Sequence, residues 1–321
     1  MEFRKVALFG ANGNIGNAIL HALMACKERS FDILCIISPK SELKYFGDRR
    51  AIMVRKLDLA TATEEEIAKV LDGIDVVLNA LGGTILRRQQ CIQNAAAMAG
   101  VKRFYPSEFG MHHIPVLPGH GPFLHPLWAE KIPLLREAMQ HPAVKSGKMT
   151  YTVIGCGELY DPPTETTLCP WLRTDPDEYV IHVVGDPDAR LDFVSRHDVA
   201  AFVVSSLCHP EASENQVFGF RGDHISFSEV ADLLRSHSGK PVRLNVIPFE
   251  DAVQGVKNPS SIPKELKEGS AFPPDFLMLL RYIEGRGDFF RPPGQFHDGL
   301  FPNSQGVPIA KYFESLFASD V

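Results

Sequence analysis

A turn with a glycine at every third position, Gly10-Ala11-Asn12-Gly13-Asn14-Ile15-Gly16, is the first feature of this 321-residue chain that could do chemistry. It lies between a short apolar run, Val6 to Phe9, and apolar residues at helical spacing from Ile15 to Leu23. Between a strand and a helix, the three glycines permit a tight turn, close approach of a pyrophosphate and close helix packing. The phosphates would meet the free N–H groups of the helix. We expect all seven residues to bind a dinucleotide; a turn that serves packing alone is the alternative.

The residues Ser38-Pro39-Lys40, after the second expected strand, bear on which dinucleotide binds. A carboxylate at this place would bond the ribose 2′-hydroxyl of NAD. The first acid here is Glu42, whereas Lys40 and Lys44 offer positive charge to the 2′-phosphate of NADP. We therefore expect NADP(H), with Ser38 and Lys40 beside that phosphate. NAD, with Lys40 an ordinary solvated lysine, is the alternative.

A second turn rich in small residues, Asn79-Ala80-Leu81-Gly82-Gly83, follows the fourth expected strand. Ligands of open α/β sheets lie beyond the carboxyl ends of the strands. We expect Leu81 and Gly82 to border the cofactor, and a simple connecting turn is the alternative.

The elements that must position these turns largely alternate between strand and helix. Strands are expected at 6–9, 31–37, 52–57, 75–78, 102–105 and 149–154, and helices at 15–23, 63–71 and 88–99. Parallel neighbours need crossover connections, which place helices on the sheet faces. The chain is therefore expected to form a Rossmann-type, doubly wound parallel sheet of the α/β class.

The second half of the chain is less regular and predicts a smaller mixed α/β region. A hairpin is expected from 179–184 and 191–194, with helices near Val199, Phe227 and Phe276. Another helix is expected from about Trp128 to Gln140, with Pro133 tolerated near its first turn. We expect an NADP-binding domain at 1–155, to which residues from about 179 to 208 return, and a substrate-binding region at 156–321.

Three segments together carry a resemblance to a known family. They are Gly10 to Gly16, the string K-R-F-Y-P-S-E-F-G at 102–110, and Glu130-Lys131-Ile132 at the start of a helix. The chain resembles the isoflavone reductase-like proteins, which are atypical short-chain dehydrogenases of the wider NmrA-like group. The resemblance implies an NADPH-dependent reductase of aromatic, phenolic secondary metabolites, with a lysine near the nicotinamide as the one catalytic group.

By motif position, the resemblance makes Lys131 the catalytic lysine. A lysine in a closed apolar site has a lowered pKa and can exchange a proton with a substrate oxygen while the cofactor delivers hydride. A surface lysine on an amphipathic helix is the alternative. Classical short-chain dehydrogenases carry a tyrosine four residues before the lysine, where this chain has Leu127, so a tyrosine-first mechanism is disfavoured.

The resemblance also implies the remaining site residues. Cofactor contacts are expected from Ser107, Phe109, Lys131, Cys156 and Gly157, and substrate contacts from Met111, His113, Leu159 and Tyr160. Leu159 stands where the family often has phenylalanine, so the shape of the substrate is expected to differ.

Two other groups of residues could suggest a metal site or a hydrolase, but their patterns do not support either. The histidines at 112, 113, 120 and 125 have no compact ligand spacing, so no metal is expected. Ser195-Arg196-His197-Asp198 invites a hydrolase interpretation, but the chain has no G-x-S-x-G motif. Asp198 is expected to be a helix N-cap.

Composition and charge exclude several classes of protein. The chain has 33 Lys and Arg against 39 Asp and Glu, a net charge of −6, which argues against nucleic acid as a partner. The longest apolar runs fall far short of the ~18 residues of a membrane helix. The N-terminus lacks the features of a secretory signal, and the six dispersed cysteines are expected to be reduced and mostly buried. We expect a cytoplasmic protein with a small aromatic substrate; its assembly could be a homodimer.

Two further functions fit the same motifs. One is a dinucleotide-sensing regulatory protein like NmrA, against which the presence of Lys131 argues. The other is a redox-neutral isomerase or cyclase that uses the same lysine.

Overall fold

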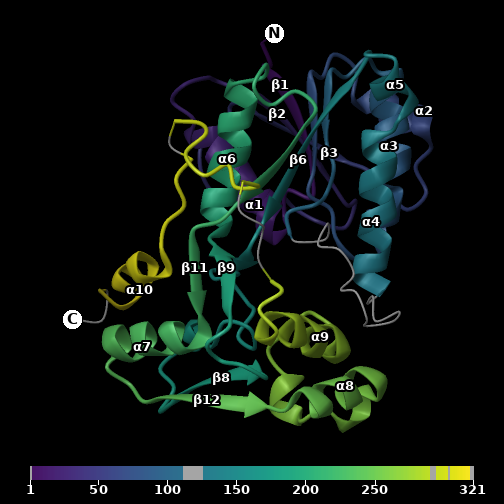
Figure 1. Cartoon of the computed structure of the whole chain (residues 1–321). Coiled ribbons are helices and arrows are strands. Elements are labelled where there is room, and N and C mark those ends of the chain that lie inside the picture. Colours follow the sequence, from purple (N-terminus) through teal and green to yellow (C-terminus); the bar gives the residue numbers. More distant parts are fainter. Residues whose placement is uncertain (1, 111–125, 290–293, 303, 319–321) are drawn as a thin grey trace.

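The central sheet of the protein consists of parallel strands only. The computed structural model describes residues 2–110, 126–289, 294–302 and 304–318, with the side chains of 126–128 excepted. Within these residues the sheet has seven strands in the order β10-β6-β5-β4-β1-β2-β3 (Figure 1). Their bounds are β1 (Lys5–Phe9), β2 (Asp32–Ile37), β3 (Ile52–Lys56), β4 (Val76–Asn79), β5 (Arg103–Tyr105), β6 (Thr150–Cys156) and β10 (Gln216–Phe220). The predicted parallel α/β sheet is confirmed.

Helices cover both faces of this sheet because its strands are apolar on both sides. In β1, Val6 and Leu8 pack in one buried cluster with α1 and α6, whereas Ala7 and Phe9 pack in another with α2 and α3. Successive side chains of a strand point to opposite faces, so β1, β2, β4 and β5 contribute to both clusters. The helices are α1 (Asn14–Ala25), α2 (Glu64–Val70), α3 (Gln89–Met98), α4 (Pro126–Met139), α5 (Pro142–Lys145) and α6 (Arg196–Cys208).

The remaining strands form two small sheets, and Figure 1 shows most of this second region below the central sheet. One small sheet has the order β11-β9-β7 and the other pairs β12 with β8. The bounds are β7 (Glu158–Leu159), β8 (Tyr179–Val184), β9 (Arg190–Val194), β11 (Asp223–Ser226), β12 (Val242–Ile247), α7 (Phe227–Ser238), α8 (Phe249–Lys257), α9 (Pro274–Gly285) and α10 (Ile309–Phe317). The helices expected near Val199, Phe227 and Phe276 are confirmed as α6, α7 and α9.

The expected hairpin of β8 and β9 is wrong. β8 pairs in parallel with β12, while β9 pairs with β11 and β7. The end of α9 packs closely on the chain that leaves β8: a Cβ at Gly285 would lie 1.5 Å from the carbonyl oxygen of Val184, and Asp186 donates its N–H to the carbonyl of Gly285. The chain after β8 therefore packs against α9 instead of folding back on the strand.

Two local expectations are also wrong. Pro133 lies inside α4 and not in its first turn, because the helix begins at Pro126. The N-cap of α6 is Ser195, whose hydroxyl accepts the N–H of Asp198 at 2.9 Å. Asp198 instead accepts the N–H of Val307, at the start of the C-terminal segment.

No disulfide joins the cysteines in the structure. None of the described helices is long and apolar enough to cross a membrane. All six thiols are free, and four of them are buried: Cys35, Cys156, Cys169 and Cys208.

The second region contains a buried cluster with two acids and one base. The guanidinium of Arg281 lies 2.8 Å from the carboxylate of Glu284 and 3.5 Å from that of Glu158, and all three side chains are at most 6% exposed. It also lies 4.6 Å from the ring centre of Phe227. Burial, together with the nearby Glu284 carboxylate, raises the pKa of Glu158 well above its usual range. Glu158 therefore keeps its proton to a higher pH in the folded protein than it would in an unfolded chain.

This proton makes the stability of the fold depend on pH. The folded pKa of Glu158 is above the unfolded value, so the free energy of unfolding falls as the pH rises above about 4.5. Glu158→Gln needs no proton, so we expect it to be more stable than the wild type at pH 8, by about 1 kcal/mol or more. The difference should shrink at pH 5. Chemical denaturation at both pH values measures it.

Glu178→Gln, which removes an exposed carboxylate paired with Arg243, is the matched control. Its stability should follow that of the wild type at both pH values. Glu158→Gln showing an equal loss of stability at pH 5 and pH 8 would contradict the assignment.

Candidate active site

The glycine turn after β1 has a backbone that only glycine permits at two places. Gly10 has φ +83°, and a Cβ there would lie 2.5 Å from the carbonyl oxygen of Ala80. A Cβ at Gly16 would lie 2.1 Å from the carbonyl oxygen of Gly10. Close packing of the turn, of α1 and of the end of β4 therefore accounts for both glycines.

The N-terminus of α1 is open toward solvent, as an anion site requires. Its N-cap, Gly13, offers no side-chain oxygen, and the first turn contains no acid. The N–H groups of Asn14, Ile15 and Gly16 have no acceptor within the helix, and Gly13 and Asn14 are exposed. Ala11 and Ile15 instead pack into the apolar cluster below. The helix end can therefore accept a phosphate through backbone N–H groups and the helix dipole.

The side chain of Asn12 ties the glycine turn to the loop after β2. Its Nδ2 donates to the carbonyl of Glu42 at 2.9 Å, and its Oδ1 accepts the N–H of Lys44 at 2.8 Å. Ser38 and Lys40 are exposed in this loop. The carboxylate of Glu42, the nearest acid, forms an ion pair with Lys56. The loop thus presents a cation and a hydroxyl, while its acid is neutralised, which suits a ribose 2′-phosphate.

The ends of β4 and β5 are joined by side-chain hydrogen bonds. The hydroxyl of Ser107 donates to the carbonyl of Leu81 at 2.7 Å. The N–H of Leu81 donates to the side-chain oxygen of Asn79 at 3.2 Å. Leu81 is half-buried and Gly82 is exposed at this edge. The two turns therefore lie side by side beyond the carboxyl ends of their strands.

Phe109 holds the P-S-E-F-G turn in an unusual backbone conformation. Its φ is +44°, in the left-handed region that non-glycine residues rarely adopt. Hydrogen bonds to the end of β6 fix it: the N–H of Phe109 donates to Ile154, and the N–H of Cys156 donates to Gly110. Gly157, which follows Cys156, is required by packing, because a Cβ there would lie 2.3 Å from the carbonyl oxygen of Asp192.

Lys131 lies in α4 and reaches across to this turn. Its Nζ donates to the carbonyl oxygen of Glu108 at 2.7 Å. Burial of the amine lowers its pKa below the ordinary lysine value, opposed by the charges of Glu108 and Cys156. The preceding residue, Glu130, forms an ion pair with Arg87 that fixes the start of the helix near the β4 side. Lys131 is thus a lysine that can lose a proton more readily than a solvated one.

The expected substrate residues have different surroundings. Leu159 is half-buried against the apolar cluster under α1 and α6. Tyr160 is buried, and its hydroxyl donates to the carbonyl of Val307 at 2.8 Å. Met111 and His113 lie outside the described residues. Leu159 therefore packs against the same apolar cluster that contains Cys156, while the hydroxyl of Tyr160 is engaged elsewhere.

Sequence reasoning missed three polar residues that connect these parts: Asn79, Gln89 and Glu108. All are almost completely buried, with exposed fractions of 0%, 2% and 1%. Gln89 and Gln93, spaced by four residues in a segment otherwise rich in alanine, were the available signal for a buried polar helix face. Glu108 lies inside the string at 102–110, whose residue types alone do not show that its backbone carbonyl is the functional group.

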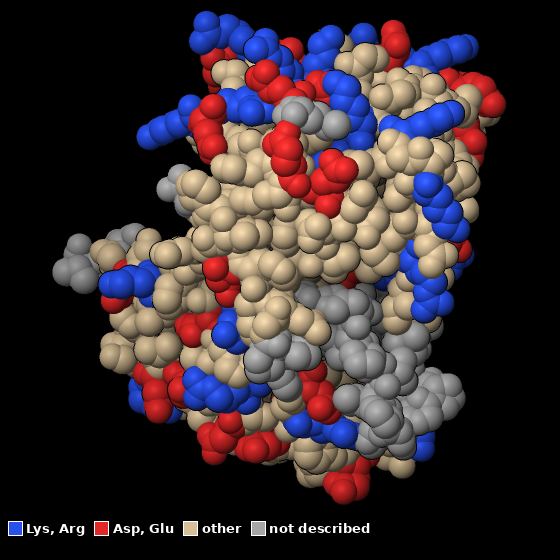
Figure 2. All heavy atoms as spheres, turned by 45° about the horizontal axis from the view of Figure 1, so that its top comes forward, with Lys and Arg blue, Asp and Glu red and all other residues tan. Residues whose placement is uncertain are grey.

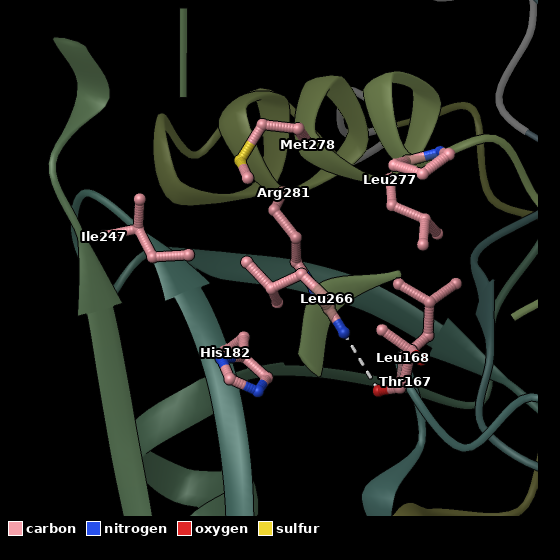
Figure 3. Close-up of a pocket in the computed structure, with 9 residues that line it drawn as sticks. Thr167, Leu168, His182, Ile247, Leu266, Leu277, Met278 and Arg281 are labelled. Carbon is pink, nitrogen blue, oxygen red and sulfur yellow. Dashed lines mark hydrogen bonds between the residues drawn. The ribbon is translucent and has the colours of Figure 1, made fainter. Parts of the chain in front are cut away.

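A separate small cavity lies in the second region (Figure 3). It has a volume of about 20 Å³. Most of the side chains that line it are apolar, and His182 and Arg281 are polar exceptions. The guanidinium of Arg281 donates to the carbonyl of Leu168 at 2.9 Å. A space of this size holds about one water molecule, so it does not fit an aromatic substrate.

Charge and metal ligands do not suggest another kind of site. On the face shown in Figure 2, acidic and basic side chains are intermixed, without an extended basic patch. Among the described residues no group of three or more His, Cys, Asp and Glu side chains could hold a metal ion. The start of α1 and Lys40 are therefore the local positive features that a phosphate at this edge would meet.

Comparisons with known proteins agree with the fold. The sequence pattern of the NmrA-like family matches residues 2–273. The isoflavone reductase homolog P3 of Arabidopsis thaliana is 26% identical over 272 residues, which cover 82% of this chain and 83% of that protein. Leucoanthocyanidin reductase from Vitis vinifera, solved with NADPH, has a TM-score of 0.72 at 19% identity over 98% of this chain and 99% of that one.

A third similar protein, AtPrR2, was solved with NADP+ and (+)pinoresinol. Its TM-score is 0.73 at 18% identity, again over 98% of this chain and 99% of that one. At these identities the structural likeness shows a shared fold over essentially the whole chain.

The close packing at Gly16 gives a direct test of the glycine turn. Because a Cβ would overlap the carbonyl of Gly10, Gly16→Ala should lower the free energy of unfolding by about 1–3 kcal/mol. It should also weaken NADP+ binding at least about tenfold, since the N–H groups of α1 would shift. Chemical denaturation and calorimetric titration measure the two effects.

Gly82→Ala is the control for stability, because Gly82 has φ −137° and no atom within 4 Å of a Cβ. It should unfold like the wild type. Wild-type stability and NADP+ affinity in Gly16→Ala would show that the turn is not packed as described.

Proposed function

Because the chain belongs to the NmrA-like family, we propose that it is an NADPH-dependent reductase of a small aromatic, phenolic metabolite. The observation that carries this proposal is the hydrogen bond from Lys131 to the carbonyl of Glu108, at the same sheet edge as the open end of α1. The relatives support it: one is named an isoflavone reductase homolog, and two similar structures were solved with NADPH or NADP+.

The residues present fit an NADP cofactor. The N–H groups of residues 14–16 would hold the pyrophosphate, and Ser38 and Lys40 would hold the 2′-phosphate. Leu81, Gly82, Ser107, Phe109, Cys156 and Gly157 would border the nicotinamide side. When bound, NADPH supplies a hydride. We propose that residues 1–155, joined by α6 and by the edge strand β10, form the cofactor domain and that the rest of 156–321 forms the substrate region.

Lys131 would act as the general acid and base. As an ammonium it donates a proton to a substrate oxygen, and the Glu108 carbonyl keeps its Nζ pointed toward the turn after β5. The lowered pKa makes proton release easier than from a solvated lysine. Turnover that needs the ammonium form should therefore decrease with rising pH, with a midpoint below the ordinary lysine value of about 10.4.

Replacing the lysine separates its chemical role from cofactor binding. Lys131→Met replaces the lysine by another long, unbranched side chain that has no proton to donate. Turnover should therefore fall about 10²–10⁴-fold while the Kd for NADP+ changes little. The wild type should consume NADPH with at least one phenolic in a panel that includes an isoflavone and pinoresinol. The wild type should lose activity at alkaline pH, and the residual turnover of Lys131→Met should not show this loss.

Lys145→Met, at the exposed end of α5, is the matched control and should keep wild-type turnover. Wild-type turnover in Lys131→Met would overturn the mechanism. Binding of NADP(H) by the wild type with no turnover on any phenolic would favour the sensing function, and turnover without net NADPH consumption would favour an isomerase or cyclase.

A further inference from the structure

A single buried amide, that of Gln89, connects three segments around the candidate active site. Its Oε1 accepts hydrogen bonds from Nδ2 of Asn79 at 3.0 Å and from the N–H of Ser107 at 2.8 Å. Its Nε2 donates to the carbonyl of Leu134 at 3.2 Å. Gln89 is the first residue of α3 and is only 2% exposed, so water does not compete for these bonds.

Each of these three contacts connects Gln89 to a different part of the candidate site. Asn79 accepts the N–H of Leu81, in the turn after β4. Ser107 directly precedes Glu108, whose carbonyl accepts the Lys131 ammonium. Leu134 lies three residues after Lys131, one turn further along α4. The amide of Gln89 therefore fixes both ends of the Lys131–Glu108 hydrogen bond relative to each other.

Helix α4 needs this outside support because Pro133 interrupts its own hydrogen bonds. Proline has no N–H, so the carbonyl four residues earlier, that of Ala129, loses its helical donor. Lys131 lies between these two positions. The helix around the lysine is thus weakened where the position of its side chain matters most.

A second glutamine on α3 makes a bond of the same kind one turn further along. Nε2 of Gln93 donates to the carbonyl of Ala138 at 2.9 Å, and Gln93 is 1% exposed. Gln89 and Gln93 are four residues apart, as are Leu134 and Ala138, so the two bonds fix the register of α4 on α3. Among the residues that the structure describes, the Gln93 side chain makes no hydrogen bond to the turns after β4 or β5, so Gln93 can serve as a control.

We propose that Gln89 is a positioning residue for the catalytic lysine: its three hydrogen bonds set the Lys131 ammonium against the Glu108 carbonyl. This inference rests on the proposed function of Lys131. It assigns a different role to Gln93, which holds the same two helices together without reaching the turn that the lysine contacts.

The first test needs no turnover. Competitive labelling of the Lys131 amine with a small acylating reagent over a range of pH, followed by mass spectrometry, gives its pKa in the folded protein. In Gln89→Leu the lysine should be released toward water, and its pKa should rise toward the ordinary lysine value, since burial is the main cause of its lowering. Gln93→Leu should leave the lysine unchanged, although both variants lose one interhelical bond.

The second test uses turnover. Gln89→Leu should lower kcat about 10- to 100-fold with the KM for NADPH within about threefold of the wild type, since small displacements of a catalytic group have effects of this size. Gln93→Leu should keep kcat within about threefold of the wild type. In the Lys131→Met background, Gln89→Leu should lower the residual turnover no further, because its effect acts through the lysine.

Gln89→Asn covers the case in which Gln89→Leu does not fold. It keeps a neutral amide on a side chain one methylene shorter, which cannot reach Asn79, Ser107 and Leu134 at once, so it should change kcat and the Lys131 pKa in the same direction. Equal losses of kcat in the Gln89 and Gln93 variants, or a wild-type lysine pKa in the Gln89 variants, would overturn the proposal. Absence of wild-type turnover on any substrate would count against the proposed function alone, since the labelling result stands without it.

Discussion

One hydrogen bond, from the Lys131 ammonium to the carbonyl oxygen of Glu108, is the interaction on which the candidate active site depends. A buried ammonium is costly unless it is paired, and here a backbone carbonyl pairs it. That carbonyl leaves the amine able to give up its proton, because it adds no full negative charge at the contact. The turn that carries it is held by the left-handed backbone of Phe109 and by two bonds to the end of β6.

The parallel sheet brings this bond and the glycine turn after β1 to one edge. Because all seven described strands of the sheet run in the same direction, the turns after β1, β4 and β5 lie together beyond their carboxyl ends. In the proposed function, phosphate recognition there would rely on the N–H groups of α1 and on Lys40, within a chain of net charge −6. The helix dipole and a nearby cation act locally, so the overall negative charge does not argue against a phosphate at this place.

Features set by neighbouring residues were predictable from the sequence, and features set by distant contacts were not. The glycine turn, α1 and the alternating strands follow from local spacing. The expected hairpin of β8 and β9 was wrong because β8 pairs with β12, about 60 residues later, and α9 packs against the intended turn. For the candidate site, the family motif was enough to predict the position of Lys131. Its partner, the carbonyl of Glu108, was not, and neither was Gln89, whose three contacts lie 10, 18 and 45 residues away.

A crystal structure of the protein with NADP+ bound tests the central claim most directly. The account predicts the pyrophosphate on the N–H groups at the start of α1 and the 2′-phosphate beside Lys40. The nicotinamide should lie close enough to Lys131 that one substrate can place a carbon against the nicotinamide C4, to receive the hydride, and an oxygen within about 3 Å of Nζ, to receive the proton. A nicotinamide bound away from the turns after β4 and β5, or a Lys131 side chain turned from Glu108 into solvent, would contradict the account.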